Sequence, residues 1–215
     1  MFTPAVSIIH GARVPFEPAR LDRQWMAELQ SRLQSRGFPS VSLFRWSGGY
    51  LRSFLPYAAL RYARELMRLW TECLAAPEGP RPLAIYAKSN GGFVAEAALR
   101  LLHQEQAQLE IDILLRVGTP DDRQTPQIPL VRRVVTIVSP SDRHYRLGVA
   151  LARLLRPGTT VPDAGSSTEH THLVLVGIRH SDFNRPIHPP ELRDGDLFDL
   201  YARCLSGEEQ GELTR

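Results

Sequence analysis

The stretch from Leu83 to Leu99 reads LAIYAKSNGGFVAEAAL, and it decides the fold. Its first four residues are apolar and predict a buried strand, while the residues from Phe93 onward are compatible with a helix. A short turn that contains Ser89 and Gly91 lies between the two. The sequence therefore predicts a strand that passes directly into a helix through a turn that carries a serine.

Ser89 has the neighbours that a nucleophile at such a turn requires. A serine held above a sheet in a strained backbone conformation needs small residues two positions before it and two positions after it. Ala87 and Gly91 meet this need. The turn would also direct the backbone N–H of Asn90 and the amino end of the helix toward a developing oxyanion. A plainer interpretation stays open, in which Ser89 only caps the helix.

Short apolar runs alternate with longer segments of helical period along the whole chain. This pattern is typical of helices packed on both faces of a mostly parallel sheet, so we expect a three-layer α/β sandwich with about six strands. The expected strands are Ala5–Ile9, Val41–Arg45, Pro82–Tyr86, Ile111–Val117, Val134–Val138 and His172–Val176. The first expected helix contains Leu21 to Leu33 and stops at Gly37, and the second runs from Ser53 onward and ends before Pro77. The other expected helices are Gly92–Gln106, roughly Tyr145–Arg156 and roughly Pro190–Leu205.

Length and composition indicate one compact domain. The chain has 215 residues, 43% of them hydrophobic and 23% charged, which is enough apolar material for a core. We expect a single domain over residues 1–205 and a polar, flexible tail over residues 206–215. The two cysteines, Cys73 and Cys204, lie in no metal or redox motif, and buried free thiols are favoured over a disulfide.

Charge and hydropathy give no indication of a nucleic-acid partner or of an integral membrane segment. The 26 basic and 23 acidic residues give a formal net charge of +3, with the basic residues scattered along the chain, so no nucleic-acid partner is expected. The segment Met1–Ile9 lacks the features of a signal peptide, and no apolar window is long enough for an integral membrane segment. A cytoplasmic protein is the expectation.

The strand–turn–helix segment around Ser89 resembles the nucleophile elbow of the α/β-hydrolase superfamily, in its serine-hydrolase branch. The usual elbow motif is G-x-S-x-G, and here Ala87 replaces the first glycine. The first expected strand ends in His10-Gly11, which resembles the segment that supplies the second oxyanion donor in this family. The resemblance implies that the N–H groups of Ala12 and Asn90 form the oxyanion hole. An ordinary turn after a strand is the alternative for His10-Gly11.

The resemblance also implies the order serine, acid, histidine, with the acid and the histidine each following a later strand. Asp142 follows the run Val134–Val138, and His180 follows the run His172–Val176. The implied catalytic residues are therefore Ser89, Asp142 and His180. Asp142 could instead be a turn residue that caps a helix, and a competing acid is present at Asp121 and Asp122, after the preceding strand.

The resemblance implies hydrolysis of a carboxylic ester or thioester of a small-molecule substrate through an acyl-enzyme intermediate. No zinc spacing, phosphate loop or dinucleotide motif is present, so no cofactor and no metal are expected, and no cap domain is expected either. Two alternatives remain open: a non-catalytic binding or scaffold protein with the same fold, and an acyltransferase that uses the same three residues. The sequence does not indicate the oligomeric state or the identity of the acyl group.

Three aromatic residues after the second expected strand, Trp46, Tyr50 and Phe54, are candidates for an acyl pocket. Packing beneath a surface loop is the competing interpretation. The alternating pair His170 and His172 is interpreted as polar residues that lead into a strand, in preference to metal ligands.

Every basic residue is arginine except Lys88, which directly precedes Ser89. Its stem could pack beside the turn, which we favour, or its charge could lie near the site.

Overall fold

A computed structural model describes residues 3–11, 19–46, 55–119, 128–143 and 168–208. Six strands form one sheet in the order β2-β1-β3-β4-β5-β6, and every neighbouring pair is parallel. The strands are β1 (Ala5–Ile9), β2 (Val41–Phe44), β3 (Leu83–Lys88), β4 (Ile111–Val117), β5 (Val131–Val138) and β6 (Glu169–Val174). The predicted α/β architecture is confirmed.

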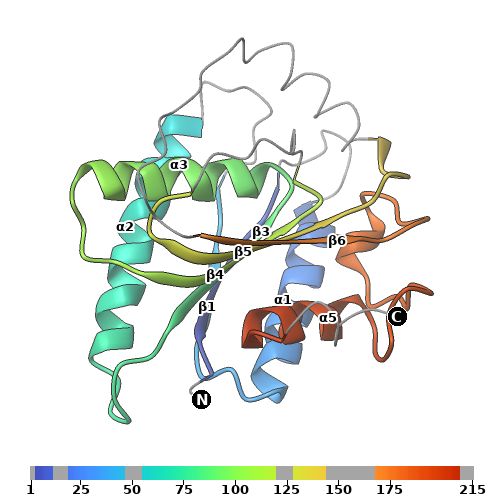
Figure 1. The fold of residues 1–215 in the computed structure, drawn as a ribbon, viewed down its shortest axis with the longest axis horizontal. Helices are drawn as coiled ribbons and strands as arrows, with labels where there is room; N and C mark the ends of the chain where they lie inside the picture. The colour runs from blue at the N-terminus through green and yellow to red at the C-terminus, as the bar shows by residue number, and fades with distance from the viewer. Residues whose placement is uncertain (1–2, 12–18, 47–54, 120–127, 144–167, 209–215) are drawn as a thin grey trace.

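Helices cover both faces of the sheet (Figure 1). The helices of the described ranges are α1 (Ala19–Ser35), α2 (Leu55–Leu74), α3 (Asn90–Gln104) and α5 (Leu197–Ser206), with a short 3₁₀ helix, η2 (Asp182–Asn184). Helices α2 and α3 pack on one face, and α1 and α5 pack on the other. None of these helices has the length and the apolar character needed to cross a membrane.

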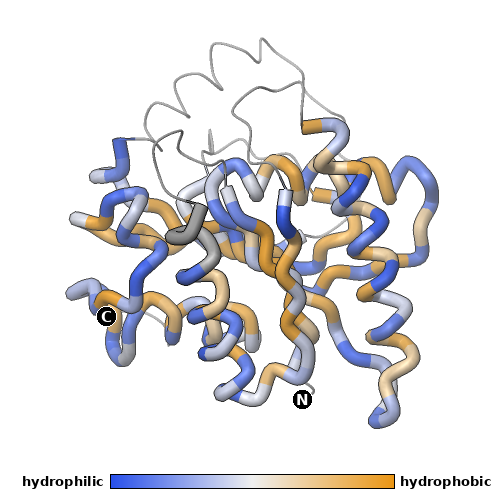
Figure 2. The backbone as a smooth tube through the Cα atoms, turned by 180° about the vertical axis from the view of Figure 1, so that it is seen from behind, coloured by the Kyte–Doolittle hydropathy of each residue, from blue (hydrophilic) through white to orange (hydrophobic). Residues whose placement is uncertain are grey.

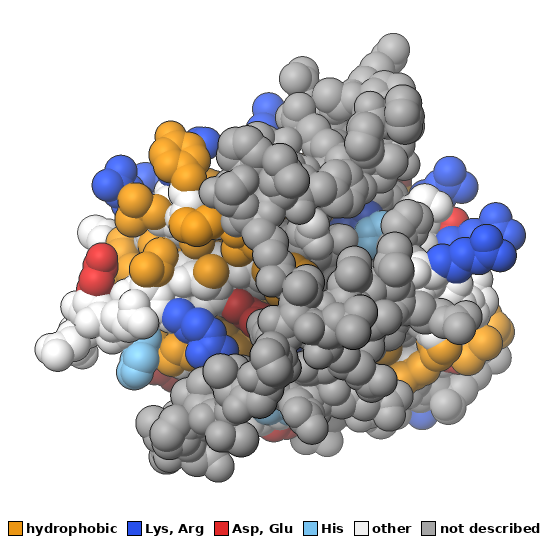
Figure 3. Space-filling model, turned by 90° about the horizontal axis from the view of Figure 1, so that it is seen from above, with side chains coloured by type: hydrophobic (Ala, Val, Ile, Leu, Met, Phe, Trp, Pro, Cys, Tyr) orange, Lys and Arg blue, Asp and Glu red, His pale blue; other side chains and the backbone are white. Residues whose placement is uncertain are grey.

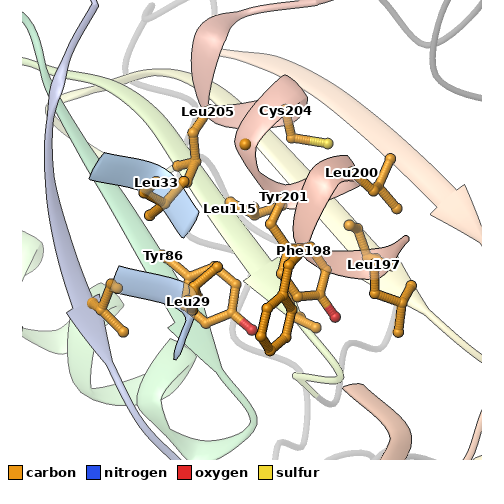
Figure 4. Close-up of a cluster of buried hydrophobic side chains, with 14 of the residues drawn as sticks. Leu29, Leu33, Tyr86, Leu115, Leu197, Phe198, Leu200, Tyr201, Cys204 and Leu205 are labelled. Atoms are coloured by element: carbon orange, nitrogen blue, oxygen red, sulfur yellow. The ribbon is translucent and has the colours of Figure 1, made fainter. Parts of the chain in front are cut away.

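The hydrophobic core is split by the sheet into two clusters. The strands that separate them are themselves strongly hydrophobic, as expected for parallel strands buried on both faces (Figure 2). In the cluster beneath α1 and α5, the side chains of Leu29, Leu33 and Tyr86 pack with those of α5 (Figure 4). The members of α5 in this cluster are Leu197, Phe198, Leu200, Tyr201, Ala202, Cys204 and Leu205.

Helix α5 begins at Leu197, seven residues later than the predicted start at Pro190. The reason is a capping box: the Asp196 carboxylate accepts hydrogen bonds from the N–H groups of Phe198 and Asp199, and the Asp199 carboxylate accepts from the N–H of Asp196. The helix ends at Gly207, whose φ of 89° is the left-handed conformation that favours glycine. The predicted helix Tyr145–Arg156 lies outside the described residues.

Other boundaries move by a few residues from their predicted positions. Strand β5 begins at Val131 rather than Val134 because Arg133 still pairs with Glu169 of β6 and with Ile113 of β4. Beyond α5, the carbonyl oxygens of Gly207 and Glu208 accept hydrogen bonds from the Arg133 guanidinium. The first part of the expected tail therefore lies against β5, and residues 209–215 lie outside the described part of the chain.

Cys73 and Cys204 are both free and buried, as predicted. Burial raises the pKa of the Cys204 thiol to about 12 and also raises the pKa of the Cys73 thiol. Both thiols therefore stay protonated at neutral pH, which suits packing and not nucleophilic chemistry.

The packing of α1 on the sheet predicts a large loss of stability for Leu29→Ala. Leu29 is completely buried, so its truncation should lower the free energy of unfolding by about 2–5 kcal/mol. Urea denaturation measures this loss. Leu60→Ala on α2 is the matched control, because Leu60 is 40% exposed, and it should cost far less. Equal losses for the two variants would contradict the assigned core.

Candidate active site

Ser89 occupies a strained turn between β3 and α3. Its backbone has φ 51° and ψ −127°, a conformation that costs a residue other than glycine about 1–3 kcal/mol. Three hydrogen bonds hold it there. Its N–H donates to Val117 O at 2.9 Å, and its carbonyl oxygen accepts from Gly92 N (2.9 Å) and from Thr119 Oγ1 (3.0 Å). Ser89 is partly exposed, so the turn presents its side chain at the end of the sheet.

Three glycines allow the backbone segments around Ser89 to approach closely. A Cβ atom on Gly91 would lie 2.6 Å from the carbonyl oxygen of His10, and one on Gly92 would lie 2.5 Å from the Thr119 side chain. A Cβ atom on Gly11 would lie 2.7 Å from Cβ of Ser89. A small residue is therefore needed two positions after Ser89 because the backbone at the end of β1 lies directly against that position.

Asn90, the predicted first oxyanion donor, is the first residue of α3. Its N–H makes no hydrogen bond to another described residue, as is usual for the first amides of a helix. The amino end of α3 also carries the positive end of the helix dipole. Ala12, the predicted second donor, lies outside the described residues, although Gly11 before it lies directly against Ser89.

Trp46 is buried and forms hydrogen bonds with His10 at the end of β1. Its indole N–H donates to His10 O at 2.9 Å, and its backbone N–H donates to His10 Nε2 at 3.4 Å. Nε2 therefore acts as the acceptor, and the opposite ring nitrogen, Nδ1, donates to Gly11 O at 2.6 Å. The two rings stack with centroids 5.9 Å apart. This cluster fixes the backbone next to Gly11, a long-range link that the sequence did not indicate.

The pocket-lining role predicted for Trp46, Tyr50 and Phe54 stays a prediction. The contacts described for Trp46 are with His10 and the core beneath α2. Tyr50 and Phe54 lie outside the described residues.

Asp142 and His180 are in direct contact. His180 Nδ1 lies 2.7 Å from Asp142 Oδ2, and the Asp142 side chain is completely buried while that of His180 is 18% exposed. Asp142 sits in the turn after β5, where its N–H donates to Ser139 O. The structure thus brings together Asp142 and His180, the two residues that the resemblance implied as acid and base. The competing acids, Asp121 and Asp122, lie outside the described residues.

Hydrogen bonds between the two loops hold this pair in place. The N–H of Gly177 donates to Ser141 Oγ at 3.1 Å, which ties the loop after β6 to the turn that carries Asp142. Beyond His180, the helix η2 is anchored by Tyr201 of α5, whose hydroxyl donates to Phe183 O at 3.1 Å. The segments before and after His180 are therefore both tied to neighbouring elements.

Ser89 and His180 both lie against the end of β4. Ser89 is bonded to Val117 O, and a Cβ atom on Gly118 would lie 3.6 Å from His180 Cε1 and 3.2 Å from the Phe183 ring. Gly118 has φ 58°, so glycine is favoured there for its backbone conformation as well as for space. Ser89, which follows β3, and His180, which follows β6, thus both approach the short segment at the end of β4.

Lys88 is buried and packs beneath the turn. Its Nζ lies 5.8 Å from the ring centroid of Trp25 on α1, a cation–π contact. Because side chains alternate along a strand, Lys88 shares the α1 face of the sheet with Tyr86. This arrangement agrees with the favoured interpretation, in which the lysine stem packs beside the turn.

A buried ion pair between α3 and β4 was not predicted. Arg116 and Glu96 are almost completely buried, and Arg116 Nη2 lies 3.1 Å from Glu96 Oε1. The pair attaches the helix that follows Ser89 to the neighbouring strand. The only signals in the sequence were one acidic residue among the alanines of α3 and one arginine in the apolar run Ile111–Val117.

Within the described ranges, no group of three or more His, Cys, Asp or Glu side chains could hold a metal ion. His170 and His172 are both exposed on the edge strand β6. Figure 3 views the molecule from above, and on the described part of this face the Lys and Arg side chains lie at several separate places.

Comparison with solved structures identifies the fold. No family model matches the sequence, and no curated protein matches it. Carboxyl esterase 2 of the fungus Tuber melanosporum matches with a TM-score of 0.55 at 11% identity, over 85% of this chain and 70% of that chain. The thioesterase RedJ of the prodiginine pathway of Streptomyces coelicolor matches with a TM-score of 0.56 at 13% identity, over 95% and 85%.

A hyperthermophilic esterase from the archaeon Pyrobaculum calidifontis matches with a TM-score of 0.52 at 12% identity, over 85% of this chain and 70% of that chain. These matches show that the chain has the α/β-hydrolase fold, which it shares with esterases and thioesterases. At such identities the likeness concerns the fold alone.

The close approach of the backbone segments at Ser89 predicts losses of different size for two neighbouring glycines. Alanine in a helix is usually more stable than glycine by about 1 kcal/mol. Gly91→Ala should nevertheless lower the free energy of unfolding by about 1–3 kcal/mol, because its Cβ meets the backbone carbonyl of His10. Gly92→Ala meets the side chain of Thr119, which can adjust, and should cost less. Urea unfolding of both variants measures the difference. A stabilised Gly91→Ala protein would contradict the close approach of Gly91 to the carbonyl oxygen of His10.

Proposed function

We propose that this protein is a serine hydrolase that cleaves a carboxylic ester or thioester of a small-molecule substrate. The observation that carries the proposal is the 2.7 Å contact between Asp142 Oδ2 and His180 Nδ1 beside the strained turn of Ser89. A buried carboxylate on one ring nitrogen selects the tautomer in which Nδ1 carries the proton. In that tautomer Nε2 carries the lone pair that a general base requires.

In the proposed mechanism, Ser89 Oγ attacks the acyl carbon while His180 Nε2 takes its proton. Asp142 holds the ring and stabilises the imidazolium that forms. The negative charge that develops on the carbonyl oxygen is stabilised by the N–H groups of Asn90 and Ala12 and by the amino end of α3. His180 then gives its proton to the leaving alcohol or thiol, which departs and leaves the acyl group on Ser89.

The second half of the reaction repeats the first with water as the nucleophile. His180 takes a proton from water, the hydroxide adds to the acyl carbon, and Ser89 leaves with the proton that His180 returns. The products are a carboxylic acid and free enzyme. The strained backbone of Ser89 supports this role, because the turn holds the hydroxyl in place before the substrate binds.

The proposed nucleophile is tested by Ser89→Ala. Wild-type protein should hydrolyse a short-chain nitrophenyl ester and react covalently with a fluorophosphonate probe. Ser89→Ala should lose the labelling and at least about 10³-fold in kcat/KM. Ser35→Ala on the exposed end of α1 is the control and should behave as wild type. A well-folded wild-type protein that shows neither turnover nor labelling would favour a non-catalytic binding protein.

The proposed acid is tested by Asp142→Asn against Asp122→Asn. An amide at residue 142 cannot hold His180 in the required tautomer, so kcat should fall about 10³–10⁴-fold. Asp122→Asn should keep its activity. Steady-state hydrolysis of the same nitrophenyl ester measures both variants. If Asp122→Asn lost activity while Asp142→Asn kept it, the acid would be assigned wrongly.

A further inference from the structure

A basic groove lies on the outer edge of the sheet, between β2 and α2. Its volume is about 790 Å³, which lies within the range of small-molecule sites. Four arginines, one glutamate and Leu43 of β2 are among the residues that line it; the charged members are Arg45, Arg61, Arg64, Arg68 and Glu65. The four arginines and one glutamate give the groove a formal charge of +3, which equals the net charge of the whole chain.

The single acid of the groove is already paired. Glu65 accepts hydrogen bonds from Arg68 at 2.7 and 3.0 Å and from Ser42 Oγ at 3.0 Å, and the Arg68 contact lowers the pKa of its carboxyl group. Arg68 also forms an ion pair with Glu72. By contrast, Arg45, Arg61 and Arg64 form no ion pair with another described residue. Three positive charges therefore face the groove without a described counter-charge.

Two aromatic rings hold the Arg61 guanidinium in place. It lies 5.7 Å from the ring centroid of Phe44 and 5.9 Å from that of Tyr57. Contacts with ring faces leave the N–H donors of the guanidinium available in its own plane. Arg64 lies three residues further on, and therefore on the same side of α2. The two guanidinium groups can therefore donate hydrogen bonds to a planar or tetrahedral oxyanion, such as a carboxylate or phosphate group.

The free edge of β2 does not favour an added polypeptide strand. The outward carbonyl of Val41 already accepts a hydrogen bond from Gln30 Nε2 at 2.7 Å. Strand addition needs a row of free backbone groups, and β2 has only four residues. A compact anionic ligand therefore suits the groove better than an extended acidic peptide.

The groove lies within reach of the candidate active site along the sheet. Phe44 pairs with Ile9, and Ile9 pairs with Ala87, so Phe44 and Ala87 lie two strand spacings, about 10 Å, apart. Arg45 follows Phe44, and Ser89 lies two residues beyond Ala87. By this spacing, the backbone at Arg45 and the backbone at Ser89 are close enough for one substrate of moderate length to reach both.

We propose that this groove binds the anionic part, a carboxylate or phosphate group, of the acyl substrate that is cleaved at Ser89. The inference rests on the proposed hydrolase function, and it names the class of substrate: an ester or thioester with a negative charge far from the scissile bond.

The groove itself is tested by binding, without any need for catalysis. Wild-type protein is titrated by calorimetry at low salt with inorganic pyrophosphate and, separately, with glutarate, which distinguishes phosphate from carboxylate ligands. We expect saturable binding of at least one of them, weakened about tenfold or more in the double variant Arg61→Gln/Arg64→Gln. Arg132→Gln removes one charge from the exposed start of β5 and should bind as wild type. No binding, or equal binding by the double variant and Arg132→Gln, would overturn the proposal.

The link to Ser89 is tested with two nitrophenyl esters of equal chain length, one ending in a methyl group and one in a carboxylate or phosphate, as the titrations direct. Wild type and Arg132→Gln should prefer the anionic ester by about tenfold in kcat/KM, and the double variant should lose this preference. Equal rates for both esters in wild type would overturn the substrate class while the hydrolase function stands. Binding of pyrophosphate or glutarate without turnover of either ester would overturn the hydrolase function and leave an anion site only.

Discussion

The rest of the site depends on one constraint, which is the close approach of the end of β1 and the start of α3 at Ser89. Gly11, Gly91 and Gly92 lie where any side chain would collide with the end of β1, with Thr119 or with Ser89 itself. Because these three positions lack a Cβ atom, α3 can start directly above the sheet, and the serine can keep a φ of 51°. The strain is stored locally, and hydrogen bonds from the neighbouring segments offset it.

The parallel sheet brings the other groups to the same place. All strands run in one direction, so the loops after β1, β3, β4, β5 and β6 emerge at a common edge. Polar contacts then fix the loops individually, and two of the three are buried. Trp46 and His10 fix the segment after β1, the Ser141–Gly177 bond joins the loops after β5 and β6, and Arg116 with Glu96 attaches α3 to β4. Buried pairs of this kind specify one geometry, because breaking them leaves an uncompensated polar group.

Local sequence patterns were sufficient to predict a feature wherever the contacts that form it are close in sequence. The strand–turn–helix around Ser89 and the strand Ile111–Val117 could be predicted, since apolar period and small residues carry the information. The two free cysteines could be predicted because they lie in no metal or redox motif. The start of α5 could not, because an apolar pattern does not identify which aspartate becomes the cap. Likewise, the sequence left Trp46 with two interpretations. Its contact with His10, 36 residues away, depends on how β2 pairs with β1.

The sequence by itself determined the α/β class, the turn at Ser89 and the positions of Asp142 and His180 after successive strands, because each follows from residue types at short spacing. Only the tertiary structure decided that these last two side chains meet at 2.7 Å, since that distance depends on strand order, on register and on hydrogen bonds between loops. The same holds for the arginine groove. Arg45 and Arg61 belong to different elements, and packing of α2 beside β2 brings their like charges together. Like charges held close together repel one another and destabilise the fold, and an anionic ligand would offset this repulsion.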